Sequence, residues 1–226
     1  MNEEEKKLDN PVWFSCMETH SEFAIGLDGF LGYHPNYCPF GGYEEQDKTE
    51  QALDDYAKLC ADFFVVGEKP HSGKDLVLKS ELSCEQMILR QPTSLPRTED
   101  IVELQATHQQ ALLQLVNLVQ PGYFKADTPQ LGSYYGIFKN GLLVAVTGER
   151  MKMNRFTEIS AVITHPAHTG KGYAKQLVSH VTHAVFAQDR IPYLHVADSN
   201  IGAIKLYEKL GFKTRRKISF WHYTKV

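Results

Sequence analysis

Ile159-Ser-Ala-Val-Ile-Thr-His-Pro-Ala-His-Thr-Gly-Lys-Gly-Tyr-Ala174 is the stretch that decides the fold, because it runs from a strand through a short loop into a glycine-rich helix start. The first turn of a helix leaves backbone N–H groups unpaired and carries partial positive charge. Gly170 and Gly172 let an anion approach that backbone closely, and Lys171 adds a charge. The stretch therefore predicts a phosphate site, although a tight strand-to-helix turn without a ligand would use the same glycines.

Two other phosphate loops do not fit this chain. It contains no G-x-x-x-x-G-K-S/T segment, and no G-x-G-x-x-G segment followed by an acidic residue about 20 positions later. The charge distribution agrees with an anionic ligand in the second half: residues 98–226 hold 15 Lys and Arg against 9 Asp and Glu, whereas residues 1–97 hold 9 against 18. Because such a surplus attracts either a nucleotide cofactor or a nucleic acid, charge alone does not choose between them.

Hydrophobic periodicity predicts the elements around the phosphate site. Asn140-Gly141 marks a tight hairpin turn, Asn200 is a plausible helix cap, and Gly211 ends the helix that Asn200 starts. The order indicates an α/β (α+β) fold with a mixed central sheet, in which an antiparallel meander is followed by strand, helix, strand, helix and strand. The predicted strands are 101–106, 134–138, 142–148, 157–164, 191–197 and 217–224, and the predicted helices are 108–119, one beginning after residue 172, and 201–210.

Two motifs in residues 98–226 resemble those of the GNAT acetyltransferases. Thr169-Gly-Lys-Gly-Tyr-Ala174 is similar to the family's Q/R-x-x-G-x-G/A motif, with Thr169 in place of the usual Gln or Arg. Asn200-x-x-Ala203-x-x-x-Tyr207-x-x-x-Gly211-Phe212 resembles the family's second signature, N-x-x-A-x-x-x-Y-x-x-x-G-F. The segments Gly148-Glu-Arg150 and Glu158-Ile-Ser-Ala-Val162 look closest to a bacterial subgroup of predicted acetyltransferases akin to glycine N-acyltransferase-like members.

The resemblance implies the GNAT fold and a reaction in which a primary amine attacks acetyl-CoA directly. The amine would belong to a small molecule or a protein, and the family needs no metal. A non-catalytic module that binds acetyl-CoA or CoA is the alternative. The cofactor contacts implied by the resemblance are the backbone of Val162, Ile163 and Thr164 for the pantetheine arm, the helix start at Thr169, Gly170, Lys171, Gly172, Tyr173 and Ala174 for the phosphates, and Asn200 and Ala203 nearby.

Two residues are the candidates for proton transfer. Glu158 stands at the start of the strand before the loop, where some family members place a catalytic glutamate, and alternation would put it on one face with Ser160, Val162 and Thr164. Glu149 is the competing base. Tyr207 is the candidate acid for the departing thiolate. Each of these residues also has a purely structural explanation. Glu158 could be a solvated carboxylate at a strand end, and Tyr207 could pack the last helix. Asn200 could serve only as a helix cap.

Residues 1–97 form a smaller α/β region of unknown role. Its pattern predicts a helix at 50–63 and strands at 63–66, 76–78 and 84–89, and a proline-containing linker at 91–96 separates it from the GNAT domain at 98–226. The acidic charge of this region suggests that it covers the acceptor side of the cleft and attracts a cationic amine.

Composition narrows the remaining classes. The four cysteines, Cys16, Cys38, Cys60 and Cys84, are widely spaced and predict reduced thiols, with neither a disulfide framework nor a metal site. No apolar run is long enough to span a bilayer, and residues 1–10 do not resemble a signal peptide, so we expect a cytoplasmic protein without a membrane partner. A nucleic-acid surface around Arg215-Arg216-Lys217 is disfavoured, because alternation along a strand turns only some of these side chains outward. A homodimer is a further expectation.

Overall fold

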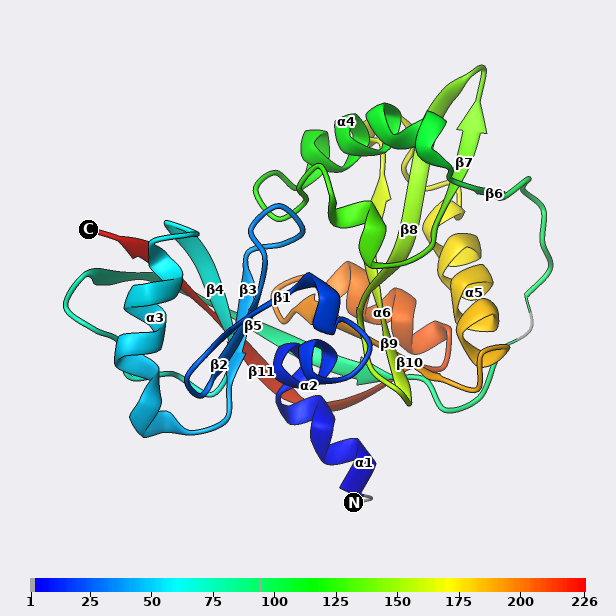
Figure 1. The fold of residues 1–226 in the computed structure, drawn as a ribbon. Helices are drawn as coiled ribbons and strands as arrows, with labels where there is room; N and C mark the ends of the chain where they lie inside the picture. Colours follow the sequence, from blue (N-terminus) through cyan, green and yellow to red (C-terminus); the bar gives the residue numbers. More distant parts are fainter. Residues whose placement is uncertain (1–2, 94) are drawn as a thin grey trace.

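A single sheet of eleven strands runs through the computed structural model, which describes residues 3–93 and 95–226 (Figure 1). The strand order is β1-β2-β3-β4-β11-β5-β10-β9-β8-β7-β6. The strands are β1 (Ala24–Leu27), β2 (Phe30–Tyr33), β3 (Phe40–Tyr43), β4 (Asp62–Gly67), β5 (Leu76–Ile88), β6 (Val102–Glu103), β7 (Tyr134–Lys139), β8 (Leu142–Lys152), β9 (Phe156–Thr164), β10 (Ile191–Ala197) and β11 (Lys213–Lys225). The α-helices are α1 (Glu3–Lys6), α2 (Pro11–Met17), α3 (Thr49–Ala57), α4 (Gln109–Val119), α5 (Tyr173–Phe186) and α6 (Ile201–Lys209).

The second half has the predicted α/β architecture, which confirms the fold class. β7, β8 and β9 form an antiparallel meander, and the hairpin turn between β7 and β8 places Asn140 and Gly141 at positive φ, as a tight primed turn requires. α5 then connects β9 to β10, and these two strands pair parallel to each other. Asn200 caps α6, because its side-chain oxygen accepts a hydrogen bond from the Ala203 N–H at 3.1 Å.

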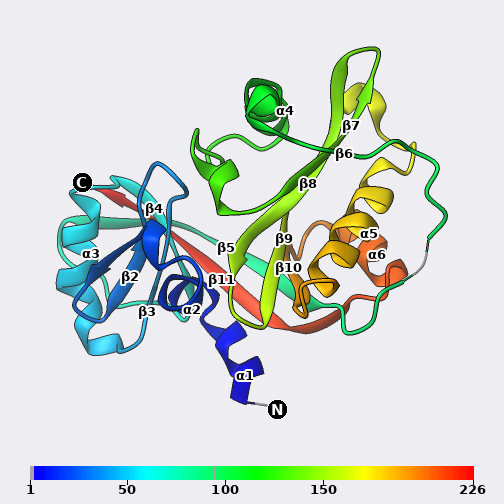
Figure 2. The same ribbon diagram turned by 45° about the vertical axis from the view of Figure 1, so that its right-hand side comes forward.

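The first region contributes strands to the middle of the same sheet. β5 lies between β10 and β11 and pairs antiparallel with both, and β4 pairs with the other edge of β11 (Figure 2). The sheet is therefore continuous across residue 97. Division of the chain at that point into an N-terminal region and a GNAT domain stays a prediction.

Several predicted boundaries are wrong. The helix predicted at 50–63 ends at Ala57, because residues 62–67 form β4 in the sheet. The strands predicted at 76–78 and 84–89 are one 13-residue strand, β5, whose exposed polar centre hid its continuity. The strand predicted at 101–106 is reduced to Val102–Glu103, and the last strand begins at Lys213 rather than 217. Of the linker predicted at 91–96, residue 94 lies outside the described residues.

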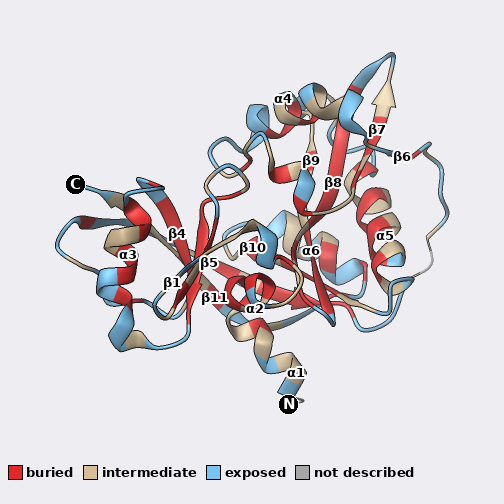
Figure 3. Cartoon of the chain, viewed as in Figure 1, coloured by how far each residue is buried: buried red, intermediate tan, exposed pale blue. Residues whose placement is uncertain are grey.

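Helices α4 and α5 cover opposite faces of the meander (Figure 3 shows the buried faces in red). Leu112, Leu115 and Val116 of α4 pack against Val146 and Ile163, whereas Val178 and Val181 of α5 pack with Ile159 of β9. Burial of these apolar side chains stabilises the meander from both sides. Within the described ranges, no helix is both long and apolar enough to cross a membrane.

A β-bulge in β9 changes the face on which its side chains lie. Ser160 pairs with Gly148 and Ile163 with Val146, so Ala161 and Val162 together oppose the single residue Thr147. Ala161 has a φ of 51°, in the left-handed region. The expectation that Glu158, Ser160, Val162 and Thr164 share one face is therefore wrong beyond Ser160, because the extra residue shifts the alternation.

Candidate active site

The parallel pair β9 and β10 separates along its length. The two strands are paired only from Phe156 to Glu158 and from Ile191 to Tyr193, and they diverge beyond this point. The second edge of β9 remains paired with β8, and that of β10 with β5. The backbone edges that face each other beyond Glu158 therefore have no strand partner in the sheet.

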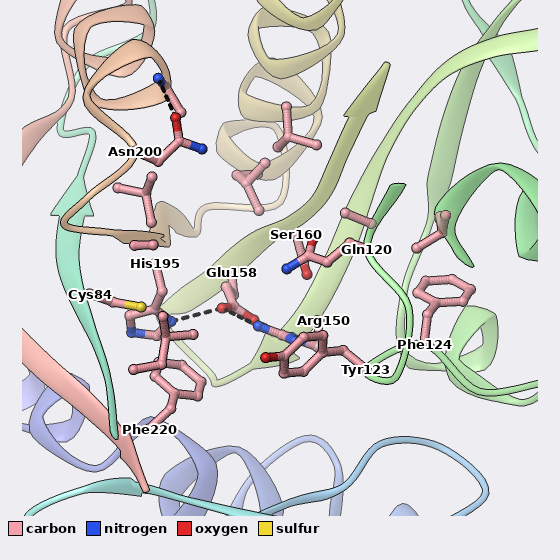
Figure 4. A pocket seen from close by; sticks show the side chains of 18 of the residues that line it. Cys84, Gln120, Tyr123, Phe124, Arg150, Glu158, Ser160, His195, Asn200 and Phe220 are labelled. Carbon is pink, nitrogen blue, oxygen red and sulfur yellow. Dashed lines mark hydrogen bonds and ion pairs between the residues drawn. The ribbon is translucent and has the colours of Figure 1, made fainter. Parts of the chain in front are cut away.

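A pocket of about 230 Å³ lies where the strands diverge (Figure 4). β9 and β10 supply its floor, α6 closes one side, and the segment after α4 closes the other. The first region contributes Phe40 and Cys84, so it forms part of the wall, as the acceptor-side hypothesis requires. The predicted site residues that line the pocket are Glu158, Val162, Asn200, Ala203 and Tyr207.

Glu158 lies at the bottom of this pocket in a dense set of hydrogen bonds. Its side chain is 1% exposed, and Arg150 donates to both carboxylate oxygens, from Nε and Nη2, at 2.8 Å each. His195 Nδ1 lies 2.8 Å from Oε1. Burial alone would raise the pKa of Glu158, but the charge and hydrogen bonds of Arg150 and the hydrogen bond of His195 lower that pKa to about 2. Glu158 is therefore a buried, ionised carboxylate.

The neighbours of His195 determine its tautomer. Arg215 Nη1 donates to Gln86 Oε1 at 2.9 Å, so the other end of the amide, Nε2, is the donor to Leu8 O at 2.7 Å and to His195 Nε2 at 3.1 Å. With Nε2 accepting, Nδ1 carries the proton that is donated to Glu158. The imidazole is therefore held between Gln86 and Glu158.

Glu149, the competing base, lies away from the pocket. Its side chain is fully buried, and Oε2 pairs with Lys152 Nζ at 2.7 Å and lies 3.4 Å from the Ser133 N–H. The register of β8 against β9 shifts between Glu149 and Lys152, and Arg150 lines the pocket while Glu149 does not. Of the two candidate bases, Glu158 lines the pocket and Glu149 does not.

Tyr207 reaches the pocket from α6. The residue is 6% exposed, and its ring packs edge-on against Phe212. Burial raises the pKa of Tyr207 well above its usual range, so the hydroxyl keeps its proton at neutral pH. In the described part of the chain this hydroxyl has no hydrogen-bond partner, and it is free to donate to a ligand.

The predicted phosphate loop has an open backbone surface. Gly170 and Gly172 have φ values of 76° and 78°, and a Cβ atom added to either would meet no described atom within 4 Å. Gly172 is the N-cap of α5 without a side-chain cap, so the first N–H groups of the helix stay available. Lys171 is exposed, whereas Thr169 donates its hydroxyl to Pro166 O at 3.2 Å within the loop.

Several predicted cofactor residues serve the core as well. Ile163 packs under α4, and Thr164 pairs with Ala145 at the end of β9. Tyr173 is buried beside Ile137, with Lys139 Nζ 5.6 Å from its ring centre. Ala174 is half-buried in the first turn of α5. Their backbone atoms, rather than their side chains, are what the groove offers to a ligand.

Sequence reasoning missed the roles of Arg150, His195 and Gln86. The sequence suggests Arg150 as a member of the Gly148-Glu-Arg150 segment and as a possible partner of Glu149, and no local spacing connects it with His195. A buried strand containing a histidine, at Ile191–Ala197, was the available signal. The described residues contain no cluster of three or more His, Cys, Asp and Glu that could hold a metal ion.

The basic run near the end of the chain is internally paired. Arg215 contacts Glu5 and Asp9, Arg216 contacts Asp9, and Lys217 contacts Asp198. These pairs neutralise much of the charge that a nucleic acid would need.

Comparison with known families agrees with the motifs. A model of the FR47-like protein family matches residues 134–221, which include β7 to β10, α5, α6 and most of β11. A search of curated proteins found no match.

Solved structures share this fold over nearly the whole chain. A protein of Kribbella flavida, named a GCN5-related N-acetyltransferase, is 15% identical with a TM-score of 0.59 and covers 89% of this chain and 88% of its own. A GCN5-related N-acetyltransferase-like protein of Streptococcus suis is 14% identical with a TM-score of 0.65, over 98% of this chain and 96% of its own. These two show the fold alone.

A third structure shows the family. It is a protein of Novosphingobium aromaticivorans, provisionally described as an acetyltransferase from the GNAT family. It is 31% identical to this chain with a TM-score of 0.88, and the match covers 97% of this chain and 98% of that one. This chain belongs to the GNAT family of acetyltransferases.

Proposed function

We propose that this chain is an N-acetyltransferase in which a primary amine attacks acetyl-CoA directly. The observation that carries the proposal is the divergence of β9 from β10 beyond the Glu158–Tyr193 pair. Beyond this pair the free edge of β9 runs toward the glycine loop that precedes α5, and the pocket containing Tyr207 and the Arg150–Glu158–His195 cluster lies where the strands part. Membership of the chain in a subgroup akin to the glycine N-acyltransferase-like proteins stays a prediction.

The groove has the features that acetyl-CoA requires. The N-terminus of α5 offers unpaired N–H groups and positive charge for the phosphates, and Gly170 and Gly172 leave that surface open. The free edge of β9 at Val162–Thr164 offers backbone donors and acceptors for the amide groups of the pantetheine arm. When bound, the cosubstrate supplies an activated acetyl group as a thioester.

Two features of the chain would promote the transfer. The bulge at Ala161 interrupts the pairing with Thr147 and leaves backbone N–H groups beside the pocket, where they can polarise a thioester carbonyl. The Tyr207 hydroxyl keeps its proton and can donate it, or a hydrogen bond, to the departing thiolate.

The surroundings of Glu158 favour a fixed anion over a general base. Arg150, His195 and the Met151 N–H at 3.4 Å occupy its oxygens, and a carboxyl with a pKa of about 2 takes up protons poorly near pH 7. We assign to Glu158 the positioning of Arg150 and His195. The proton of the substrate ammonium group is then transferred to water in the pocket. The alternative, that Glu158 is the base as predicted from the sequence, is distinguished from this assignment by the Glu158→Gln variant.

A thiol-release assay separates the enzyme from a non-catalytic CoA-binding module. Acetyl-CoA is incubated with the protein and a panel of amino acids, aromatic amines and polyamines, while free thiol and acetyl-CoA binding are followed. We expect thiol release that depends on the amine. Acetyl-CoA binding without amine-dependent release across the panel would favour the binding module.

A further inference from the structure

The two charged side chains that line the pocket, Arg150 and Glu158, already form an ion pair with each other. Among the described residues that line it, Glu158 is the carboxylate and Arg150 the permanent cation, and they form a bidentate ion pair. His195 occupies a further position on Glu158. The pocket therefore offers no free carboxylate to a cationic group, and a polyamine would have to lose its hydration without gaining an anionic partner.

Arg150 has donors left over. A guanidinium carries five N–H groups, and Glu158 takes one from Nε and one from Nη2. Nη1 has no hydrogen-bond partner in residues 3–93 and 95–226. The side chain of Arg150 lines the pocket and is 14% exposed whereas that of Glu158 is 1% exposed, so Arg150 is the more accessible member of the pair.

The orientation of this guanidinium is fixed. Its central carbon lies 4.6 Å from the centre of the Phe40 ring, and two hydrogen bonds from Nε and Nη2 hold it to Glu158. A planar, preorganised fork of N–H groups is well suited to a carboxylate. Because the fork lies in a partly buried site, an incoming carboxylate would satisfy donors that are costly to leave unpaired.

The position of Arg150 suits an amine that stands next to such a carboxylate. Glu158, to which Arg150 is bound, and Ser160 are two residues apart on β9, about 7 Å at the ordinary strand rise. Ser160 directly precedes the bulge at Ala161, beside which we place the thioester carbonyl. An α-amino acid has one carbon between its amine and its carboxylate, so a carboxylate at Arg150 brings the amine toward the bulge.

Aromatic side chains form part of the remaining wall, together with aliphatic residues such as Leu82 and Val116 and the polar residues Gln120 and Thr128. Phe40, Phe220, Tyr123 and Phe124 come from β3, β11 and the segment after α4, and Figure 4 shows Tyr123 and Phe124 on the side of the pocket away from Asn200. Such walls favour an apolar or aromatic group, because they bury it without an unpaired polar atom. A zwitterionic head and an aromatic or large apolar side chain together match these surroundings.

We infer that the acceptor is a free α-amino acid with an aromatic or large apolar side chain, whose carboxylate binds the Nη1 end of Arg150. The inference rests on the proposed acetyltransferase function and replaces the expectation of a cationic amine. The acceptor class is therefore the free α-amino acids, and the residue that recognises their carboxylate is Arg150.

Matched substrates test the inference on the wild-type protein. Thiol release from acetyl-CoA is measured with L-phenylalanine, L-phenylalaninamide, 2-phenylethylamine, glycine and spermidine. We expect kcat/KM for L-phenylalanine to exceed the values for its amide and for 2-phenylethylamine by at least about tenfold, as for other charged hydrogen bonds lost in a partly buried site. Glycine and spermidine should be poorer acceptors than L-phenylalanine.

The outcomes separate the two proposals. Equal or higher kcat/KM for the amide, the decarboxylated amine or spermidine would overturn the amino-acid inference and leave the acetyltransferase intact. A better rate with glycine would overturn the aromatic part of it. Absence of amine-dependent thiol release with all five compounds would overturn the acetyltransferase function and the inference with it.

A variant links the preference to Arg150. Arg150→Lys keeps the charge but loses the fork, and we expect the ratio of kcat/KM for L-phenylalanine to that for its amide to fall toward one. Arg155→Lys is the matched control, because Arg155 is exposed and its side chain bonds only the Asp189 carbonyl among described groups. An unchanged ratio in folded Arg150→Lys, shown by normal acetyl-CoA binding, would contradict the role of Arg150. If that variant does not fold, the wild-type comparison still decides.

Discussion

His195 Nδ1 lies 2.8 Å from Glu158 Oε1, and the same carboxylate is held from the other side by Arg150. The contact joins β10 to β9 at the residues where their pairing ends. It therefore lies in the wall of the pocket, and together with the larger effect of Arg150 it accounts for a carboxylate that stays ionised while buried.

The hydrogen bonds around His195 predict a neutral ring with the proton on Nδ1. Gln86 Nε2 donates to His195 Nε2, and its orientation is set by Arg215. Nitrogen-15 chemical shifts of the imidazole should show a protonated Nδ1 and an unprotonated Nε2 at neutral pH, and Gln86→Leu should weaken this preference. A wild-type ring protonated on Nε2 would contradict the assignment.

Glu158→Gln distinguishes a positioning residue from a base. We expect the variant to lose activity by a similar factor, on the order of tenfold or more, at every pH from about 6 to about 9, because its effect is to release Arg150 and His195. The measurement is kcat/KM against pH for both proteins. A loss that disappears at high pH, where the amine deprotonates unaided, would instead identify Glu158 as the base.

The same carboxylate predicts how stability depends on pH. Its pKa is lowered from an ordinary value of 4.5 to about 2 in the folded state, so its contribution is complete above 4.5 and is lost as the pH falls toward 2. Denaturant unfolding should show the stability difference between wild type and Glu158→Gln shrinking across this window. A constant difference would mean that the folded and unfolded pKa values are alike.

Tyr207→Phe should lower kcat by roughly 100-fold, the lower end of the usual effect of a general acid, with little change in acetyl-CoA affinity. The ring that packs against Phe212 is retained, so the variant removes only the hydroxyl. Steady-state rates and calorimetric binding give the two quantities. An unchanged kcat would remove Tyr207 from the chemistry.

Gly172→Ala tests the phosphate loop against a matched glycine. Gly172 and Gly141 have φ values of 78° and 79°, and at both a Cβ would meet no described atom within 4 Å. Both substitutions should cost about 1 kcal/mol of unfolding free energy through backbone strain. Only Gly172→Ala should also raise the Kd for acetyl-CoA, because its Cβ crowds the phosphates. Equal Kd values in the two variants would place the phosphates elsewhere.

The sequence predicted the second half well, because its information is local. Asn140-Gly141 defines a hairpin, Asn200 a cap, and the two glycines before α5 a helix start, and each works through its own backbone geometry. The predicted residues Glu158, Asn200 and Tyr207 all line one pocket.

The parts that could not be predicted depend on contacts distant in sequence. β5 lies between β10 and β11, and no local pattern reveals that a strand from the first region enters there. The bulge at Ala161 breaks the alternation that placed Val162 with Glu158. Gln86, Arg150 and His195 come together only because their strands are brought close in the sheet.

Transfer of a labelled acetyl group tests the central claim most directly. Acetyl-CoA with carbon-13 in its carbonyl is mixed with the protein and L-phenylalanine, and the label is followed by NMR. The account predicts that the thioester signal decays while an amide carbonyl signal grows at the same rate, and that Tyr207→Phe slows both together. Decay to free acetate alone, or a bound thioester that does not decay with any amine, would contradict it.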